Sequence, residues 1–287
     1  MFKPKQIAVM VHPQVANAAE EAERVADFLS QRQVQVEHGS LYSAELRARV
    51  TGGEFDVLIA LGGDGTMLRA GHLCAPAGTP ILGINMGRFG FLTEVNRSDW
   101  QQALARLLEG GFWLEKRMVL HGEHMRQDEL LNTWNVVVNE VVVSRGKFVR
   151  PVHLSTCVDG RYLTTYVADG LIVSTPTGST AYGLAVGGPI LPPELHNILL
   201  VPVAPHLSID RGIVLAEGSS VSISVQTDHQ AVVSIDGQAP IDLENGDVIS
   251  ARASEHVLQF IRFQDPGYFY RNLTPHMSQN PATNTPK

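Results

Sequence analysis

The chain has 287 residues, of which 44% are hydrophobic and 18% are charged, values typical of a globular protein. Its 22 basic and 29 acidic residues give a net charge of −7, and no run of Lys or Arg is longer than a pair. Nucleic acids and anionic membranes are bound through clustered cations, so this charge pattern argues against both as partners. Backbone amides can still form a local anion site, which the net charge does not exclude.

The termini and the cysteines favour a soluble, cytoplasmic protein. The opening MFKPKQIAVMV lacks the long apolar run and small-residue cleavage site of a signal peptide. No apolar segment approaches the roughly 20 residues that a membrane helix needs. Cys74 and Cys157 lie far apart and predict neither a disulfide nor a metal pair.

Strand and helix patterns alternate over the first hundred residues, which predicts an α/β domain with an open parallel sheet. The run FDVLIAL at 55–61 is apolar almost throughout, as expected for a strand covered on both faces. Further strands are expected at 6–11, 34–37 and 80–84, and helices at 16–32, after 66 and after 98.

Strand-like runs predominate after residue 112 and predict an all-β, sandwich-like domain. Asp159-Gly160, between two of these runs, is a hairpin signal. The runs are 114–120, 134–144, 152–158, 161–168, 213–216, 221–227, 231–235, 248–251 and 257–263. One segment, TGSTAYGLAV at 177–186, is instead compatible with a helix.

The sequence GGDGT at 62–66 follows the apolar strand and precedes a helical pattern. Ligands of open α/β sheets bind beyond the carboxyl ends of strands, and adjacent glycines let amides approach a phosphate. An aspartate in such a loop would repel phosphate, but it suits a general base or a partner of Mg²⁺. A tight turn in which Asp64 caps the next helix is the alternative interpretation.

Two other polar segments interrupt apolar surroundings. Asn139-Glu140 lies within NVVVNEVVV, and because adjacent strand residues face opposite ways, at least one of the pair is expected to point into apolar packing. The pair could bind a polar ligand or mark a strand edge or bulge. The segment 169–182, DGLIVSTPTGSTAY, suits phosphate or ribose recognition at a helix start, or a capped Ser/Thr-rich turn.

Taken alone, Asp236-Gly237 predicts only a hairpin turn. His121 and His124 lack a third ligand at metal-site spacing, so no protein-held metal is predicted. No Gly-x-Ser-x-Gly elbow is present, which argues against a serine hydrolase.

In this order and spacing, GGDGT, NE and DGLIVSTPTGSTAY resemble the NAD kinases. The segments NMGRFGFL at 85–92, GGPI at 187–190 and IDGQ at 235–238 are similar to that family as well. GGDGT alone is shared with diacylglycerol and sphingosine kinases and, more loosely, with phosphofructokinases, whereas the 169–182 segment is more specific to NAD kinases.

The resemblance implies an enzyme that uses ATP with Mg²⁺, or another divalent cation, to phosphorylate the 2′-hydroxyl of the adenosine ribose of NAD, giving NADP. It implies an α/β domain at 1–111, a β-rich NAD-binding domain at 112–264 and a return to the first domain at 265–275. A disordered tail is expected at 276–287, from its polar, Pro- and Asn-rich composition. NAD is expected between the domains and toward a neighbouring subunit of a homodimer or homotetramer.

The resemblance also implies the site residues. Asp64 is the expected catalytic base, and Gly62, Gly63, Gly65 and Thr66 form the expected ATP phosphate loop. The expected NAD-binding residues are Asp64, Gly65, Arg69, Phe91, Asn139, Glu140, Arg150, Asp169, Thr180, Ala181, Tyr182, Ala185 and Gln238.

Two other functions are compatible with parts of this pattern. A lipid or sphingoid-base kinase would share GGDGT, but the sequence has no basic amphipathic helix for membrane approach. A non-catalytic NAD-binding sensor is disfavoured only by Asp64, since binding alone gives no reason for a carboxylate beside phosphates.

Overall fold

The computed structural model describes residues 3–87, 90–206 and 208–278. The chain divides into a first unit, 1–116 with 258–287, and a second unit, 117–257. Each division falls within a long strand, and both of these strands have residues in the two units. These strands are β6 (Trp113–Arg126) and β17 (Val248–Arg262).

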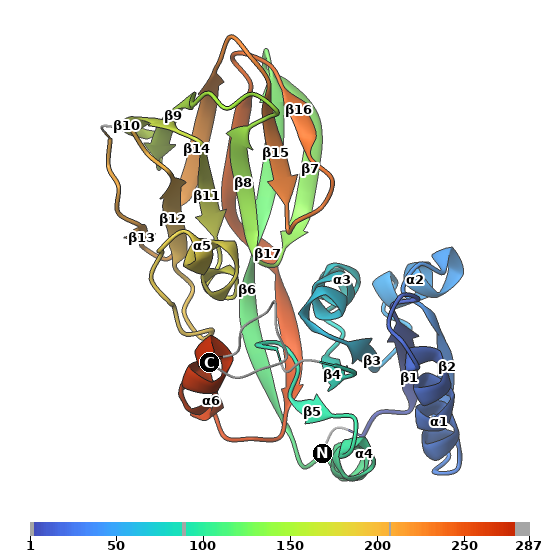
Figure 1. The fold of residues 1–287 in the computed structure, drawn as a ribbon. Coiled ribbons are helices and arrows are strands. Elements are labelled where there is room, and N and C mark those ends of the chain that lie inside the picture. The colour runs from blue at the N-terminus through green and yellow to red at the C-terminus, as the bar shows by residue number, and fades with distance from the viewer. Residues whose placement is uncertain (1–2, 88–89, 207, 279–287) are drawn as a thin grey trace. The chain divides into compact units, whose positions relative to one another are not determined.

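The first unit is built on a parallel sheet with the strand order β17-β4-β3-β1-β2, and β5 pairs with β4 (Figure 1). All six residues of β3 are buried, as the apolar run predicts for a strand covered on both faces. The strands are β1 (Gln6–Val11), β2 (Gln35–Ser40), β3 (Val57–Gly62), β4 (Ile81–Asn85) and β5 (Val95–Asn96).

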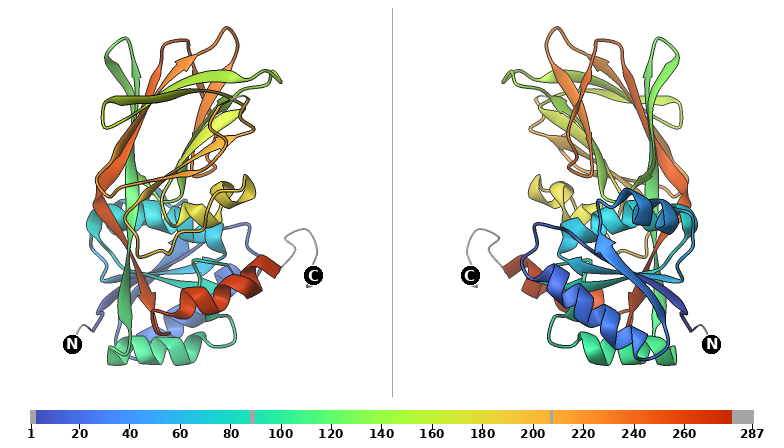
Figure 2. Two further views of the ribbon diagram at one scale, coloured as in Figure 1. Left: turned by 90° about the vertical axis from the view of Figure 1, so that its left-hand side faces the viewer. Right: turned by 90° about the vertical axis from the view of Figure 1, so that its right-hand side faces the viewer.

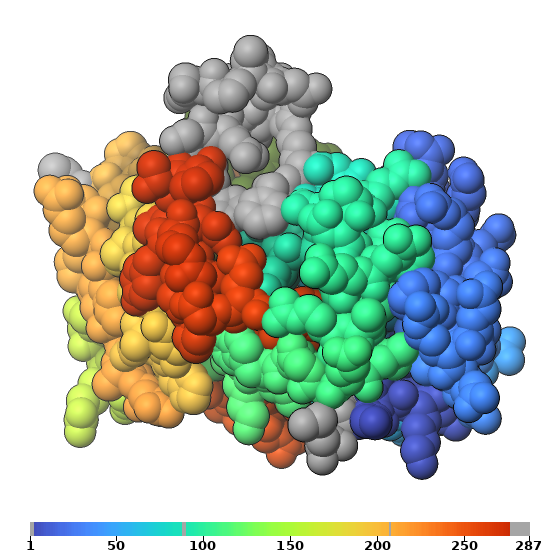
Figure 3. All heavy atoms as spheres, turned by 90° about the horizontal axis from the view of Figure 1, so that it is seen from below, coloured from blue at the N-terminus to red at the C-terminus, as the bar shows by residue number. Residues whose placement is uncertain are grey.

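Helices cover both faces of this sheet. Helix α2 contacts α3 on one face (Figure 2), and α1 and α4 contact each other on the other face, which Figure 3 shows from below. On the α1 side, Trp100 stacks edge-on against Phe28 and donates its indole N–H to the buried Glu21. The helices are α1 (Ala18–Ser30), α2 (Ala44–Thr51), α3 (Asp64–Cys74), the 3-10 turn η1 (Ala75–Ala77), α4 (Trp100–Glu109) and α6 (Tyr268–Ser278).

Helix α6 corrects the expected tail. It extends to Ser278, so residues 276–278 are helical where the composition predicted disorder. The remainder of that prediction, 279–287, lies outside the described residues.

The second unit consists of two antiparallel layers. In one, β17 continues the order β10-β9-β14-β17 and β6 pairs with β7; the other has the order β13-β12-β11-β8-β15-β16. Its elements beyond β6 and β17 are β7 (Glu129–Val137), β8 (Glu140–Arg145), β9 (Val152–Val158), β10 (Arg161–Ala168), β11 (Gly170–Ser174), η2 (Gly178–Thr180), α5 (Tyr182–Ala185), β12 (Ile198–Val203), β13 (Ile213–Leu215), β14 (Ser220–Gln226), β15 (Ala231–Ile235) and β16 (Ile241–Leu243).

One core cluster joins the two layers, which gives the unit the sandwich-like form that the sequence predicts. It contains Leu154 of β9 and Ile223 of β14 from one layer, together with Val143 of β8 and Leu171 of β11 from the other.

Two sequence predictions for this unit have different outcomes. The hairpin at Asp159-Gly160 is confirmed, with φ of 50° and 71° at its two residues. The run 134–144 is not one strand: it breaks after Val137, and the chain passes from β7 into β8 of the other layer.

In the part of the chain that the structure describes, none of the helices combines the length and the hydropathy of a membrane-spanning segment. Cys74 is buried and Cys157 partly buried, and both are free thiols.

Candidate functional site

The GGDGT turn lies at the carboxyl edge of the parallel sheet, where β3 ends at Gly62 and α3 begins at Asp64. The neighbour of β3 on one side is β1, whose following helix α1 covers the face opposite to α2 and α3. The sheet therefore reverses its winding direction between β1 and β3, and ligands of open α/β sheets bind at such switch points. The geometry places the turn where a nucleotide phosphate is expected.

The glycines of this turn have different structural reasons. A Cβ at Gly62 would collide with the buried side chain of Thr66, so packing explains this glycine. Within the described part of the chain, a Cβ at Gly63 would meet no heavy atom within 4 Å, and one at Gly65 would meet only Arg69 Nη1, at 3.6 Å. Gly63 has φ −102°, which any residue can adopt. Neither packing nor backbone strain requires glycine at 63 or 65, which favours close approach of a ligand.

Asp64 is held in a fixed orientation by the chain after β4. Its Oδ2 accepts the backbone N–H of Phe91 at 2.9 Å, and its Oδ1 accepts that of Leu92 at 3.0 Å. Gly90 permits this approach, because a Cβ there would collide with the Asp64 carboxylate. A carboxylate has about four lone-pair sites, so two amide bonds leave it able to accept a further proton donor.

In the second unit, Asp236 organises the Asn139-Glu140 pair. Its carboxylate accepts the backbone N–H groups of Val138, Asn139 and Glu140 at 2.8, 2.7 and 3.0 Å, at the break between β7 and β8. With Gly237, Asp236 forms a turn in which both φ angles are positive. The Asp-Gly signal thus predicted the turn correctly, but not the role of its carboxylate.

Glu140 is buried, with 6% of its surface exposed, and Asn139 is partly exposed, so one of the pair points inward as expected. Among the described residues, Glu140 Oε2 has no hydrogen-bond partner. Burial, together with the nearby negative charge of Asp236, raises the pKa of the Glu140 carboxyl to about 8. The carboxyl is therefore protonated near neutral pH and can donate a hydrogen bond to a ligand.

The hydroxyl-rich segment folds directly onto this pair. Thr175 donates its N–H to Asn139 O at 2.8 Å and its hydroxyl to Val138 O at 2.7 Å, and it accepts the N–H of Gly178 at 3.0 Å. A Cβ at Gly178 would collide with the Asn139 carbonyl, which explains that glycine. The structure therefore brings together the NE pair and the 169–182 segment, which the sequence predicted separately.

Most hydroxyls of this segment serve the fold. Ser174, Thr175 and Ser179 have no exposed surface, and they bond to backbone groups. Thr180, Ala181 and Tyr182 are partly or largely exposed, and Ala185 is exposed on α5, so these four remain accessible to a ligand.

Asp169 forms an ion pair that the sequence did not predict. Arg145 Nε lies 3.0 Å from Asp169 Oδ1, and the Arg145 N–H donates to the Asp169 carbonyl at 2.9 Å. The buried Arg117 also escaped prediction; its Nη1 lies 3.4 Å from the hydroxyl of Thr177. No spacing rule marks either arginine, because each partner lies on a different strand or loop.

The remaining predicted residues are exposed. Arg69 donates from Nη1 to the carbonyl of Gly65, within the GGDGT turn, at 3.0 Å. Gln238 follows the Asp236 turn directly, and its N–H donates to Ile235 O. Arg150 lies before β9, and the described residues give it no bond to the other predicted residues.

The resemblance to the NAD kinases implies a divalent cation, and the side chains near Asp64 indicate how such an ion would be bound. Within residues 3–87, 90–206 and 208–278, no group of three His, Cys, Asp or Glu side chains could hold a metal ion. Asp64 is the single carboxylate of the glycine turn, which suits Mg²⁺ that arrives with a nucleotide and keeps mostly phosphate and water ligands.

The fold is that of dinucleotide kinases whose structures are solved. A crystal structure of an NAD kinase from Archaeoglobus fulgidus in complex with ATP matches with a TM-score of 0.74 and 27% identity, covering 96% of this chain and 100% of the other. A yeast NADH kinase complexed with NADH shares the fold, with a TM-score of 0.81 and 21% identity over 100% of this chain and 91% of the other.

Sequence comparisons define the family more closely. The model of the ATP-NAD kinase N-terminal domain matches residues 43–112, and that of the C-terminal domain matches 138–263. NAD kinases from Heliobacterium modesticaldum and Moorella thermoacetica are 39% and 38% identical, over 95% and 92% of this chain and 98% and 87% of theirs. The chain belongs to the ATP-NAD kinase family and is an enzyme of the kinase class.

Proposed function

We propose that this enzyme transfers the γ-phosphoryl group of ATP to the 2′-hydroxyl of the adenosine ribose of NAD, giving NADP and ADP. The observation that carries the proposal is the fixed Asp64 carboxylate, held by two amides at the start of α3 within a glycine turn. The relatives named NAD kinase and the ATP-bound structure support the choice of substrates.

The residues perform distinct parts of this reaction. Asp64 accepts the proton of the ribose 2′-hydroxyl while that oxygen forms a bond to the γ-phosphorus. The bond between the γ-phosphorus and the β,γ-bridging oxygen breaks, and ADP leaves. Gly63 and Gly65 leave space for the donor phosphates. A positioned carboxylate base typically contributes about 10²–10⁴-fold to such a step.

The NAD-binding group of the second unit supplies polar recognition. Protonated Glu140 donates a hydrogen bond, and Asn139 and Asp169 offer amide and carboxylate groups to the ribose and nicotinamide portions. Asp236 supports this group, because its carboxylate holds the backbone of 138–140. The additional contacts to the dinucleotide come from Arg150, Thr180, Ala181, Tyr182, Ala185 and Gln238.

Mg²⁺ bound to ATP supplies charge neutralisation at the transferred phosphoryl group. We further propose that the enzyme acts in the cytoplasm as a homodimer or homotetramer. Light scattering of the purified chain measures this assembly, and a monomer at assay concentration would contradict it.

One assay tests the proposed function. Purified protein is incubated with Mg²⁺, ATP and NAD, and NADP is measured with an NADP-specific dehydrogenase. Formation of NADP that depends on all three components is the expected result. Phosphorylation of a diacylglycerol or sphingoid base without NADP would identify a lipid kinase, and NAD binding without turnover would identify a sensor.

Replacing Gly63 with alanine should weaken the use of ATP without unfolding the protein. The new methyl group enters space that no described side chain occupies, and the backbone at 63 suits alanine, so the melting temperature should change little. We expect kcat/KM for ATP to fall by about 10-fold or more, the loss that a misplacement of roughly 1 Å can cause.

Gly62→Ala is the matched control, because its methyl group collides with Thr66 inside the protein. This variant should lose stability. Steady-state kinetics with thermal denaturation separate the two effects, and an unchanged kcat/KM for ATP in Gly63→Ala would remove phosphate approach as the reason for this glycine.

A further inference from the structure

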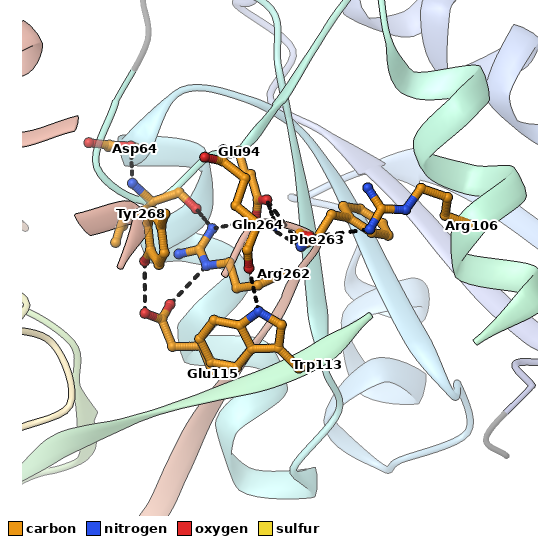
Figure 4. A network of polar contacts seen from close by, with 10 residues as sticks. Asp64, Glu94, Arg106, Trp113, Glu115, Arg262, Phe263, Gln264 and Tyr268 are labelled. Atoms are coloured by element: carbon orange, nitrogen blue, oxygen red, sulfur yellow. Dashed lines mark hydrogen bonds and ion pairs between the residues drawn. The ribbon is translucent and has the colours of Figure 1, made fainter. Parts of the chain in front are cut away.

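Arg262, at the end of β17, is an arginine buried within the first unit. Only 1% of its surface is exposed. Its Nε donates to Glu115 Oε2 at 2.9 Å, and its Nη1 donates to the backbone carbonyl of Leu92 at 3.0 Å (Figure 4). The guanidinium therefore bridges a carboxylate of β6 and the loop that follows β4.

The surroundings of Arg262 fix both its charge and its orientation. The Tyr268 hydroxyl donates to Glu115 Oε1 at 2.7 Å, so Glu115 cannot turn away from the arginine without losing that bond. Phe260 and Tyr268 each place a ring centroid 5.0 Å from the guanidinium carbon. Burial lowers the pKa of Arg262, but the attraction of Glu115, Tyr268 and Glu94 outweighs it and raises the pKa overall, so the side chain stays charged.

The Leu92 carbonyl connects Arg262 to the Asp64 carboxylate. Leu92 is 3% exposed, and its N–H donates to Asp64 Oδ1 at 3.0 Å. The preceding residue, Phe91, donates its N–H to Asp64 Oδ2 at 2.9 Å. Arg262 thus holds one end of the short segment whose two amides orient Asp64.

A second contact ties the same segment to the end of β17. Glu94 Oε1 accepts the N–H groups of Phe263 and Gln264 at 3.0 and 2.6 Å. The Arg262 side chain therefore binds the backbone of the loop after β4, and the Glu94 side chain of that loop binds the backbone after β17. This arrangement restrains the position of 91–94 more strongly than apolar packing would, because hydrogen bonds are directional.

Stability alone is a poor reason for a buried arginine. Replacing a buried ion pair with well-packed apolar side chains is often neutral or stabilising. A guanidinium is needed, however, where one side chain must bind a carboxylate and a backbone carbonyl in fixed geometry.

We propose that Arg262 is a positioning residue for Asp64: by binding the Leu92 carbonyl it orients the two amides that hold the carboxylate toward the reacting hydroxyl. The inference rests on the proposed function, in which Asp64 accepts the proton. Glu115 and Tyr268 serve the same purpose, because they fix the guanidinium.

Arg262→Lys is the principal test. A lysine can keep one ionic bond to Glu115 but cannot also reach the Leu92 carbonyl with a planar fork. We expect kcat to fall by about 10- to 100-fold, as for a small misplacement of a reacting group, while KM for ATP and for NAD changes by less than about 3-fold. A merely structural role would not separate kcat from KM in this way.

A double-mutant cycle tests whether Arg262 affects kcat through Asp64. If Arg262 acts through Asp64, adding Arg262→Lys to Asp64→Asn should lower kcat no further. Independent losses that multiply would overturn the proposal.

Hydrogen exchange gives a readout that does not depend on activity. The amides of 91 and 92 should exchange faster in Arg262→Lys than in wild type, whereas the amides of β3 should be unchanged. If wild type makes no NADP, the proposed function fails, yet this exchange still decides whether Arg262 positions the segment. Unchanged exchange at 91–92 would overturn the inference.

Arg106→Gln is the matched control. Arg106 Nη2 donates to the carbonyls of Phe263 and Gly111 at 3.2 and 3.3 Å, so it anchors the same end of β17 without contacting Leu92 (Figure 4). This variant should lose some stability and keep its kcat.

Should Arg262→Lys fail to fold, Tyr268→Phe offers a second test, because it removes only the hydroxyl that orients Glu115. Faster exchange of the amides at 91–92 is again expected, and unchanged exchange would again contradict the proposal.

Discussion

Asp64→Asn should lower the rate of NADP formation by at least about 100-fold, the lower end of what a positioned general base contributes. The amide of asparagine has nearly the shape of the carboxylate but cannot accept the ribose proton. It can still accept one of the two N–H groups of Phe91 and Leu92, so the turn keeps most of its geometry. NAD affinity, measured by calorimetry, should remain within a few-fold of wild type.

The control for this variant is Asp56→Asn. The Asp56 carboxylate also accepts two backbone amides, those of Lys5 and Gln6, at 2.7 and 2.9 Å, but it lies just before β3 and away from the glycine turn. The Asp56→Asn variant measures how much stability is lost when a carboxylate that accepts two backbone amides becomes an amide. We expect about 1 kcal/mol per altered hydrogen bond. Near-normal turnover in Asp64→Asn would remove Asp64 from the role of base.

The sequence predicted best where the signal is local. The buried strand β3, the turn at 62–66 and the helix after it follow one another along the chain, so composition and glycine spacing suffice to identify them. The 169–182 segment and Asn139-Glu140 were recognised in the same way, from polar residues in apolar surroundings.

Contacts between distant residues were beyond such reasoning. Asp236 lies 96 to 98 residues from the amides that it accepts, and alone it resembles an ordinary hairpin turn. Arg262 is 147 residues from Glu115 and 170 from Leu92. Neither pairing leaves a periodic or compositional signal, because only the folded sheet brings the partners together.

The strand errors have a related cause. The valine-rich run 134–144 has one uniform preference for strand, whereas the break after Val137 lies where three backbone amides bind the distant Asp236 carboxylate. The strand β12 was not predicted from the sequence. It contains Pro202, and proline argues against a strand in the middle of a sheet.

Asp64 and Glu140 illustrate how environment gives two carboxyl groups different roles. Asp64 is partly exposed and bonded by two N–H donors, an environment that suits a carboxylate which accepts a proton. Glu140 is buried near Asp236, with one oxygen that has no partner in the described structure, an environment that suits a neutral hydrogen-bond donor. Exchanging Glu140 for glutamine should therefore lower the rate of NADP formation far less than exchanging Asp64 for asparagine.

Glu140→Gln should change how the free energy of unfolding depends on pH. Burial and then Asp236 raise the pKa of Glu140 from 4.5 to about 8. Below pH 4.5 the group is protonated in both the folded and the unfolded chain and contributes no pH dependence. Between pH 4.5 and 8 the folded chain holds a proton that the unfolded chain has released, so stability falls as pH rises, by at most about 1.4 kcal/mol per unit. Above pH 8 the loss is complete.

The difference between Glu140→Gln and wild type isolates this contribution, because other titrating groups are common to both. Urea denaturation at intervals from about pH 5 to 9 should show the variant gaining about 2–4 kcal/mol relative to wild type as pH rises to 8 and no more beyond it. Glu129→Gln, at an exposed position at the start of β7, is the control and should run parallel to wild type.

The same variant separates the protonation of Glu140 from its binding role. A glutamine amide donates a hydrogen bond at every pH, so the affinity of Glu140→Gln for NAD should stay constant where that of wild type falls through pH 8. If wild type and variant lose affinity together, a group other than Glu140 governs binding. If their stabilities run parallel over the whole pH range, Glu140 is ionised in the folded protein, and its contribution to NAD recognition is that of an acceptor.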